Sequence, residues 1–242
     1  SYNMRTYIIR HGDAGYQQGK VDISMANDLT ENGVDTINKT VLHLSNTIEG
    51  EGNSPVQLYS SPFGRCLHTS RIVRDVLASR GREIKPIQIT NDLEEVRNFE
   101  WNLFYPLVVG GELKYNGDAI AVDVDLTNPQ RASPTRYFRG DLAHKLSKTA
   151  RDSLPKSYLE RINQFERYPS VTSRLSSWLA EHKNNEGIEL IVCTHEGLTG
   201  DLIEQVTRNK EAYLQRGKYF AVKNENGIFV PYLSQDNSVS TQ

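Results

Sequence analysis

Two histidines in this chain of 242 residues each follow an apolar run and precede a glycine. Residues 7–9 are apolar and lead into Arg10, His11 and Gly12, while residues 188–193 lead into Thr194, His195, Glu196 and Gly197. Each apolar run reads as a buried strand, and α/β sheets bind their ligands beyond the carboxyl ends of such strands. An imidazole in that place can attack a phosphorus atom while a neighbouring guanidinium holds the phosphate oxygens.

A third segment brings another cation to the same predicted edge. Ser60, Ser61 and Pro62 follow a short apolar run, and Arg65 then falls on the first turn of an expected helix. If the sheet is parallel, Arg10, His11, Arg65 and His195 converge around one point. Two guanidinium groups, two imidazoles and a helix amino terminus fit a phosphoryl group better than a carboxylate, which offers fewer oxygens.

The elements that must position these residues alternate between strand and helix patterns. Residues 56–60 and 84–90 are the next expected strands, and a helix separates each from the strand before it. Thr30 is the expected N-cap of the first helix, and Ser61 is the expected cap of the second, with Pro62 at its first position. This order predicts an α/β three-layer sandwich with a mainly parallel central sheet. The first helix carries one apolar face: Val34, Ile37, Val41, Leu44 and Ile48.

Regular patterns return after residue 155. We expect helices around residues 158–165, 171–179 and 198–206, and a closing hairpin of residues 219–222 and 228–232. The polar tail of residues 234–242 is expected to be frayed.

The segment between these regular parts is looser and interrupts a single domain that spans residues 1–242. It is interpreted as an insertion at about residues 99–156 that acts as a cap, with a turn at Gly110-Gly111 and a strand at 119–126. Residues 131–156 hold seven Lys or Arg and two Asp, a local net charge of +5. Our hypothesis is that this part contacts the leaving group of a substrate, and a solvated basic surface is the alternative. The candidate contact residues are Arg136, Tyr137 and Arg139.

Composition excludes several function classes. The net charge is −2 and the pI about 6.3, so no strong basic field points to nucleic acid or to an anionic membrane. No apolar run is long enough to cross a bilayer, and the first residues lack the apolar core of a signal peptide. Cys66 and Cys193 are too few for a disulfide framework, so we expect buried free thiols and a cytoplasmic location.

Metal and cofactor chemistry also lack sequence support. No histidine follows His195-Glu196 at the spacing of a zinc protease, and no glycine-rich nucleotide loop or Gly-x-Ser-x-Gly elbow occurs. The sequence therefore predicts neither a metal nor a cofactor.

Taken together, these motifs resemble those of the histidine phosphatases, the phosphoglycerate-mutase-like superfamily. The similarity covers most of the chain outside residues 99–156, and the motifs stand in the order found in that family. The matching residues are Arg10-His11-Gly12, Leu29-Thr30-x-x-Gly33, Ser60-Ser61-Pro62-x-x-Arg65 with Thr69, Leu93-x-Glu95, and Thr194-His195-x-Gly197.

The resemblance implies a role for each polar residue of the predicted site. His11 would be the nucleophile that becomes phosphorylated, and Glu95 the general acid that protonates the leaving oxygen and then activates water. Glu94 is a rival for that role, although motif spacing favours Glu95. The residues that would hold the phosphate oxygens are Arg10, Arg65 and His195.

The sequence departs from the family pattern after Gly12. Asp13 and Ala14 stand where many members carry Glu or Gln and a small hydroxyl residue, and Gln17 occupies the place of a phosphate-binding Asn. Gln17 could still donate an amide hydrogen bond to phosphate. Glu196 could favour a charged imidazole at His195 or point into solvent.

From these residues we predict a metal-independent phosphomonoester hydrolase that works through a phosphohistidine on His11. Phosphoglycerate-mutase-type phosphoryl transfer is the nearest alternative, and a weakly active module that binds phosphorylated ligands is another. The expected partner is a phosphorylated small molecule or phosphoester, with no nucleic acid and no membrane. The sequence makes no prediction of oligomeric state.

Overall fold

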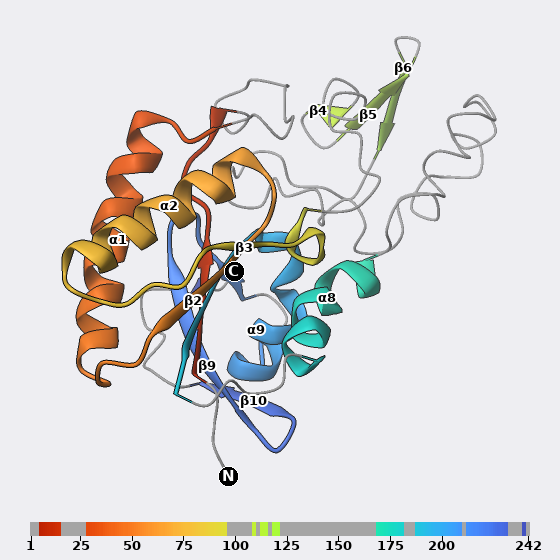
Figure 1. The fold of residues 1–242 in the computed structure, drawn as a ribbon. Helices are drawn as coiled ribbons and strands as arrows, with labels where there is room; N and C mark the ends of the chain where they lie inside the picture. Colours follow the sequence, from red (N-terminus) through yellow and green to blue (C-terminus); the bar gives the residue numbers. More distant parts are fainter. Residues whose placement is uncertain are drawn as a thin grey trace.

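The protein is described by a computed structural model in which helices cover both faces of a central sheet (Figure 1). The structure describes residues 5–15, 28–95, 108–109, 112–115, 118–121, 168–181, 187–209, 212–231 and 239–240. The expected helix at 158–165 lies outside these residues, as does most of the expected insertion at 99–156.

The central sheet has six strands in the order β10-β9-β1-β7-β2-β3. The neighbours β1, β7, β2 and β3 pair in parallel, whereas β9 pairs antiparallel with β1 and with β10. The predicted mixed α/β fold with a mainly parallel sheet is therefore confirmed. The strands are β1 (Arg5–Arg10), β2 (Val56–Ser60), β3 (Gln88–Ile89), β7 (Glu189–Thr194), β9 (Tyr219–Glu225) and β10 (Ile228–Pro231).

Four α-helices among the described residues form the outer layers of the sandwich. Figure 1 shows α1 and α2 on one face of the sheet and α8 and α9 on the other. Successive side chains of β1 alternate accordingly, because Tyr7 and Ile9 pack toward α1 and α2 and Ile8 packs toward α8 and α9. The helices are α1 (Glu31–Glu49), α2 (Gly64–Ser79), α8 (Tyr168–Glu181) and α9 (Gly200–Thr207).

Helix α1 begins where the sequence predicts. The Thr30 side chain accepts a hydrogen bond of 3.0 Å from the Gly33 backbone N–H, which is the expected N-cap. The apolar positions spaced three and four residues apart face the sheet, and Ile37, Val41 and Leu44 are fully buried.

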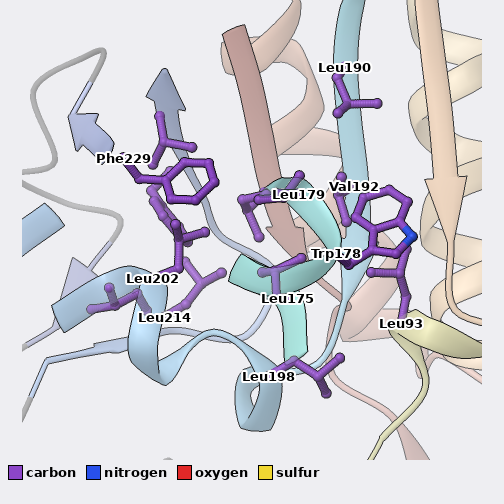
Figure 2. Close-up of a cluster of buried hydrophobic side chains, with 14 of the residues drawn as sticks. Leu93, Leu175, Trp178, Leu179, Leu190, Val192, Leu198, Leu202, Leu214 and Phe229 are labelled. Atoms are coloured by element: carbon purple, nitrogen blue, oxygen red, sulfur yellow. The ribbon is translucent and has the colours of Figure 1, made fainter. Parts of the chain in front are cut away.

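The opposite core cluster packs α8 and α9 against the sheet (Figure 2). Trp178 of α8 packs edge-to-face on Tyr59 of β2 with ring centroids 4.9 Å apart. Leu93 also lies in this cluster, at the end of the short 3-10 helix η2 (Asn91–Leu93). The buried Leu93 therefore anchors the loop that carries Glu94 and Glu95.

The described residues also form two smaller sheets. Strands β4 (Val108–Val109), β5 (Glu112–Tyr115) and β6 (Asp118–Ala121) pair antiparallel, with Val109 opposite Glu112 on the two sides of the expected turn. Strands β8 (Tyr213–Leu214) and β11 (Val239–Ser240) form the other. The expectation of a frayed tail was wrong at Val239–Ser240, because this dipeptide pairs with β8.

Three predicted boundaries differ from the structure. Helix α2 begins at Gly64, so Ser61 is not its N-cap. The strand expected at 84–90 is reduced to Gln88–Ile89 and a single bridge of Ile84, because Pro86 has no N–H for the ladder. The helix expected at 198–206 is divided into the 3-10 helix η3 (Glu196–Leu198) and α9.

The close approach of the His11 loop to α1 can be tested with Gly12→Ala. A Cβ at Gly12 would lie 2.8 Å from both the Gly33 carbonyl oxygen and Ile37 Cγ1. Since one neighbour is backbone and cannot move away cheaply, we expect the variant to lose about 1–3 kcal/mol in urea unfolding. Gly50→Ala is the control, because its nearest atom would be 3.4 Å away and its φ is −64°. Equal stability of the two variants would contradict this packing.

Candidate active site

The four predicted cationic or imidazole side chains meet at the carboxyl edge of the parallel strands. His11 follows β1, His195 follows β7, and their ring centroids are 5.3 Å apart. Arg65 lies between them, with Nε 3.3 Å from His11 Nε2 and Nη2 3.3 Å from His195 Nδ1. The side chains are almost fully buried: Arg10 is 4% exposed, His11 1%, Arg65 1% and His195 0%. The predicted convergence around one point is therefore observed.

His11 is held in one orientation by its own turn. Its Nδ1 lies 2.7 Å from the Gly12 carbonyl oxygen, and since a carbonyl can only accept, Nδ1 carries the ring hydrogen. Nε2 therefore has the lone pair, and it faces Arg65. The backbone is fixed as well, because the His11 N–H donates to Thr194 and its carbonyl accepts from Gly217. His11 thus presents a nucleophilic nitrogen to the centre of the site.

His195 is oriented from behind by Ser61, a contact that the sequence did not reveal. Ser61 Oγ lies 2.8 Å from His195 Nε2 and accepts a second hydrogen bond of 3.3 Å from the Phe63 N–H. Because a hydroxyl can donate or accept, this bond holds the ring in either tautomer and leaves Nδ1 directed toward Arg65. The Phe63 ring packs edge-on against His195, with centroids 5.1 Å apart. Ser61 is thus a positioning residue instead of the helix cap expected from sequence.

Glu95, the carboxylate that motif spacing favours, lies next to His195. It is 6% exposed, and its Oε2 is 3.6 Å from His195 Nδ1. Glu94, the rival candidate, is only half-buried. The site therefore places the buried Glu95 carboxyl group beside His195.

The loop that carries Glu95 is held by two elements distant in sequence. Thr194 donates from Oγ1 to the Leu93 carbonyl at 2.8 Å. Arg174 of α8 donates from Nη1 to the Asp92 carbonyl and from Nη2 to the Glu95 carbonyl, each at 3.0 Å. Sequence reasoning missed Arg174, because nothing in the helix pattern of α8 indicates a partner some 80 residues earlier in the chain.

Burial and the neighbouring positive charges favour the neutral form of both imidazoles. Burial lowers the pKa of His11 well below its usual 6.5, and the charges of Arg65 and Arg10 lower it further. Burial also lowers the pKa of His195, with Arg65 and His11 adding to the effect. Glu196 is buried, so it does not point into solvent, and the pKa of His195 is lowered where a charged imidazole would need it raised.

The two cysteines are buried and free, as predicted. Cys66 Sγ lies 3.5 Å from His195 Nε2, and burial raises the pKa of the Cys66 thiol. The thiol therefore stays protonated and packs behind His195.

Some candidates fall outside the described residues, and the described ones form no metal centre. Gln17, Arg136, Tyr137 and Arg139 are not among the residues that the structure describes. Within the described part of the chain, no group of three or more His, Cys, Asp or Glu side chains could hold a metal ion. In the same part of the chain, no helix is long and apolar enough to cross a membrane.

Comparisons with known proteins agree with this geometry. The model of the histidine phosphatase superfamily (branch 1) matches residues 6–104, which include Arg10, His11, Arg65 and Glu95. The resemblance inferred from sequence is therefore confirmed. The chain matches none of the curated proteins with which it was compared.

Solved structures with the same fold include mutases and phosphatases. A phosphoglycerate mutase from Bacillus anthracis superposes with a TM-score of 0.60 at 15% identity, covering 98% of this chain and 94% of the other. A phosphoserine phosphatase from Entamoeba histolytica, in complex with 3-phosphoglyceric acid, superposes with a TM-score of 0.56 at 15% identity, covering 99% of this chain and 98% of the other. A mycobacterial glucosyl-3-phosphoglycerate phosphatase superposes with a TM-score of 0.51 at 13% identity, covering 93% of this chain and 92% of the other. At these identities the likeness concerns the fold.

The lowered imidazole pKa values make stability depend on pH. Between the native pKa values and 6.5, the unfolded histidines bind protons and the buried ones do not, so stability falls as pH is lowered through this range. Each histidine adds a slope of up to about 1.4 kcal/mol per pH unit. Urea unfolding between pH 7.5 and pH 5 should show a shallower slope for His195→Gln than for the wild type. Equal slopes would contradict the buried neutral state.

Proposed function

We propose that this chain, whose residues 6–104 match the model of the histidine phosphatase superfamily, hydrolyses phosphomonoesters through a phosphohistidine on His11. The substrate is a phosphorylated small molecule. The observation that carries the proposal is the orientation of His11, whose Nε2 lone pair faces Arg65 at 3.3 Å inside a buried site. No metal is required by this mechanism.

The phosphoryl group would sit among the residues that converge at the strand ends. Arg65 lies within 3.3 Å of both imidazoles. The oxygens of a phosphate placed there would accept charge-assisted hydrogen bonds from its N–H groups. Arg10 donates from Nη1 to the Leu214 carbonyl at 3.0 Å, while its buried Nε has no hydrogen-bond partner among the described residues. A buried N–H without a partner is costly, so an anion beside Arg10 would stabilise the site.

The reaction would proceed in two in-line steps. In the first, His11 Nε2 forms a bond to phosphorus, the bond to the leaving oxygen breaks, and Glu95 gives that oxygen its proton. In the second, Glu95 takes a proton from water as the water oxygen attacks phosphorus. The nitrogen–phosphorus bond then breaks, and inorganic phosphate and neutral His11 are released. Arg10, Arg65 and His195 would stabilise the charge on the equatorial oxygens in both steps.

The neutral state of His11 suits the first step. A protonated imidazole has no lone pair to offer, and burial together with Arg65 and Arg10 keeps the pKa of His11 low. The nucleophile is therefore ready at pH values where an exposed histidine would be largely protonated.

We propose that residues at about 99–156 form an insertion in a single domain and that Arg136, Tyr137 and Arg139 contact the leaving group. The basis is the local charge of residues 131–156, which is +5 in a chain of net charge −2.

Phosphate release tests the proposed reaction. Wild-type protein in EDTA should liberate inorganic phosphate from p-nitrophenyl phosphate, and His11→Ala should lower this activity by at least about a thousandfold, since the variant lacks the nitrogen that would form the intermediate. His43→Ala, on the exposed side of α1, is the control for loss of an imidazole. Activity that depends on added metal, or that survives His11→Ala, would refute the mechanism. Transfer of the phosphoryl group to an acceptor without net phosphate release would favour the mutase alternative.

The general acid can be identified with a pair of adjacent variants. Glu95→Gln should reduce kcat for an alkyl phosphate by about 10²–10⁴, because a poor leaving group needs the proton that Glu95 supplies. The loss should be smaller for p-nitrophenyl phosphate, whose leaving group departs without protonation. Glu94→Gln is the matched control, since this neighbour is only half-buried. A larger loss for Glu94→Gln would assign the role to Glu94 instead.

A further inference from the structure

A third arginine lies at the same edge of the sheet as His11. Strand β9 runs antiparallel to β1 with Tyr219 opposite Ile9, so the residues just before Tyr219 lie beside the catalytic end of β1. The Gly217 N–H donates to the His11 carbonyl at 3.0 Å, and the Lys218 carbonyl accepts from the Arg10 N–H at 3.0 Å. Arg216 is therefore attached through its own backbone to the residues that would hold the phosphoryl group.

The turn that carries Arg216 has little freedom to move. Gly217 adopts a left-handed conformation with φ of +68°, and a Cβ there would lie 2.9 Å from Thr36 Cγ2. The Thr40 hydroxyl of α1 donates to the Gly217 carbonyl. The turn thus has a fixed position between α1 and the His11 loop.

The Arg216 side chain is also held in place. Its Nη1 lies 3.1 Å from Asp13 Oδ1, and the Thr30 hydroxyl donates to Asp13 Oδ2 at 2.8 Å. Asp13 follows directly on Gly12, so the ion pair sits on the loop that presents His11. Thr30 is in turn fixed as the N-cap of α1.

Exposure separates Arg216 from the two arginines of the buried site. Its side chain is 16% exposed and that of Asp13 is 18% exposed, whereas Arg10 and Arg65 are at most 4% exposed. A substrate whose phosphoryl group is held by the buried residues has to extend toward solvent, and Arg216 is a partly exposed cation attached to the His11 loop. The Arg216 charge interacts electrostatically with His11 and contributes to its lowered pKa.

We propose that Arg216 is a specificity-determining residue that binds a second anionic group, a carboxylate or a second phosphate, on the leaving portion of the substrate. This inference rests on the proposed function and extends it to a class of phosphomonoesters with a second negative charge. A planar guanidinium has five N–H donors, so Arg216 can remain bonded to Asp13 and also donate to an incoming anion. Asp13 would orient the guanidinium before the substrate binds, which reduces the entropy lost on binding.

Two ligands that differ in a single group test the inference. Glycerol 3-phosphate carries a hydroxymethyl group where 3-phosphoglycerate carries a carboxylate. Calorimetric titration in a His11→Ala background avoids turnover and gives the dissociation constant of each ligand. We expect the protein to bind 3-phosphoglycerate more tightly than glycerol 3-phosphate. Arg216→Met should reduce this preference, the ratio of the two dissociation constants, by about tenfold, as loss of a charge-assisted hydrogen bond would.

Two further variants complete the design. Arg216→Lys keeps the charge but loses the planar fork, so it should lose part of the preference, and it serves as the test if Arg216→Met does not fold. Arg74→Met removes the same charge from an exposed position nine residues beyond Arg65, about 13 Å along α2, and should keep the preference.

The outcomes separate this inference from the proposed function. The role of Arg216 would be overturned if Arg216→Met weakened the binding of both ligands equally or weakened neither. It would also be overturned if the parent protein showed no preference between the two ligands. If the wild type hydrolyses p-nitrophenyl phosphate while Arg216→Met keeps the preference, only the specificity role fails. If the wild type releases no phosphate from any ester, the proposed function fails.

Discussion

The structure depends on the burial of two guanidinium groups beside two imidazoles at one point. Charges of the same sign repel strongly in a medium of low dielectric constant, so the imidazoles must stay neutral where Arg10 and Arg65 are charged. That state gives His11 its lone pair. The same concentration of N–H donors makes the site favourable for an anion with several oxygens, and a phosphoryl group meets that requirement.

The scaffold keeps this arrangement in place through backbone contacts. The His11 N–H bonds to the carbonyl of Thr194, and the Ser61 N–H bonds to the carbonyl of Cys193, so the ends of β1, β7 and β2 are tied together. The loop with Glu95 is attached to the same edge by Thr194 and Arg174. Because each polar group is positioned by rigid elements, little reorganisation is needed when the reaction proceeds.

The site has an inner and an outer part with different electrostatics. The inner part is buried and cationic, and it suits a group that every substrate would share. The outer part, Asp13 and Arg216, is partly exposed and balanced in charge, so water and salt weaken its interactions. Under the proposals above, such a division would let the inner part carry the chemistry and the outer part discriminate among substrates, since a substitution of Asp13 or Arg216 does not replace His11 or the residues proposed to hold the phosphate oxygens.

The sequence by itself indicated a mainly parallel sheet and the convergence of Arg10, His11, Arg65 and His195 at its carboxyl edge. Both follow from local periodicity and from the rule that parallel strands share one carboxyl edge, whereas the preference for Glu95 over Glu94 came from the family resemblance. Only the tertiary structure decided that Ser61 orients His195, that Arg174 holds the Glu95 loop, and that Arg216 meets Asp13. The physical reason is that these hydrogen bonds join residues 79 to 203 positions apart, so no local pattern in the chain records them.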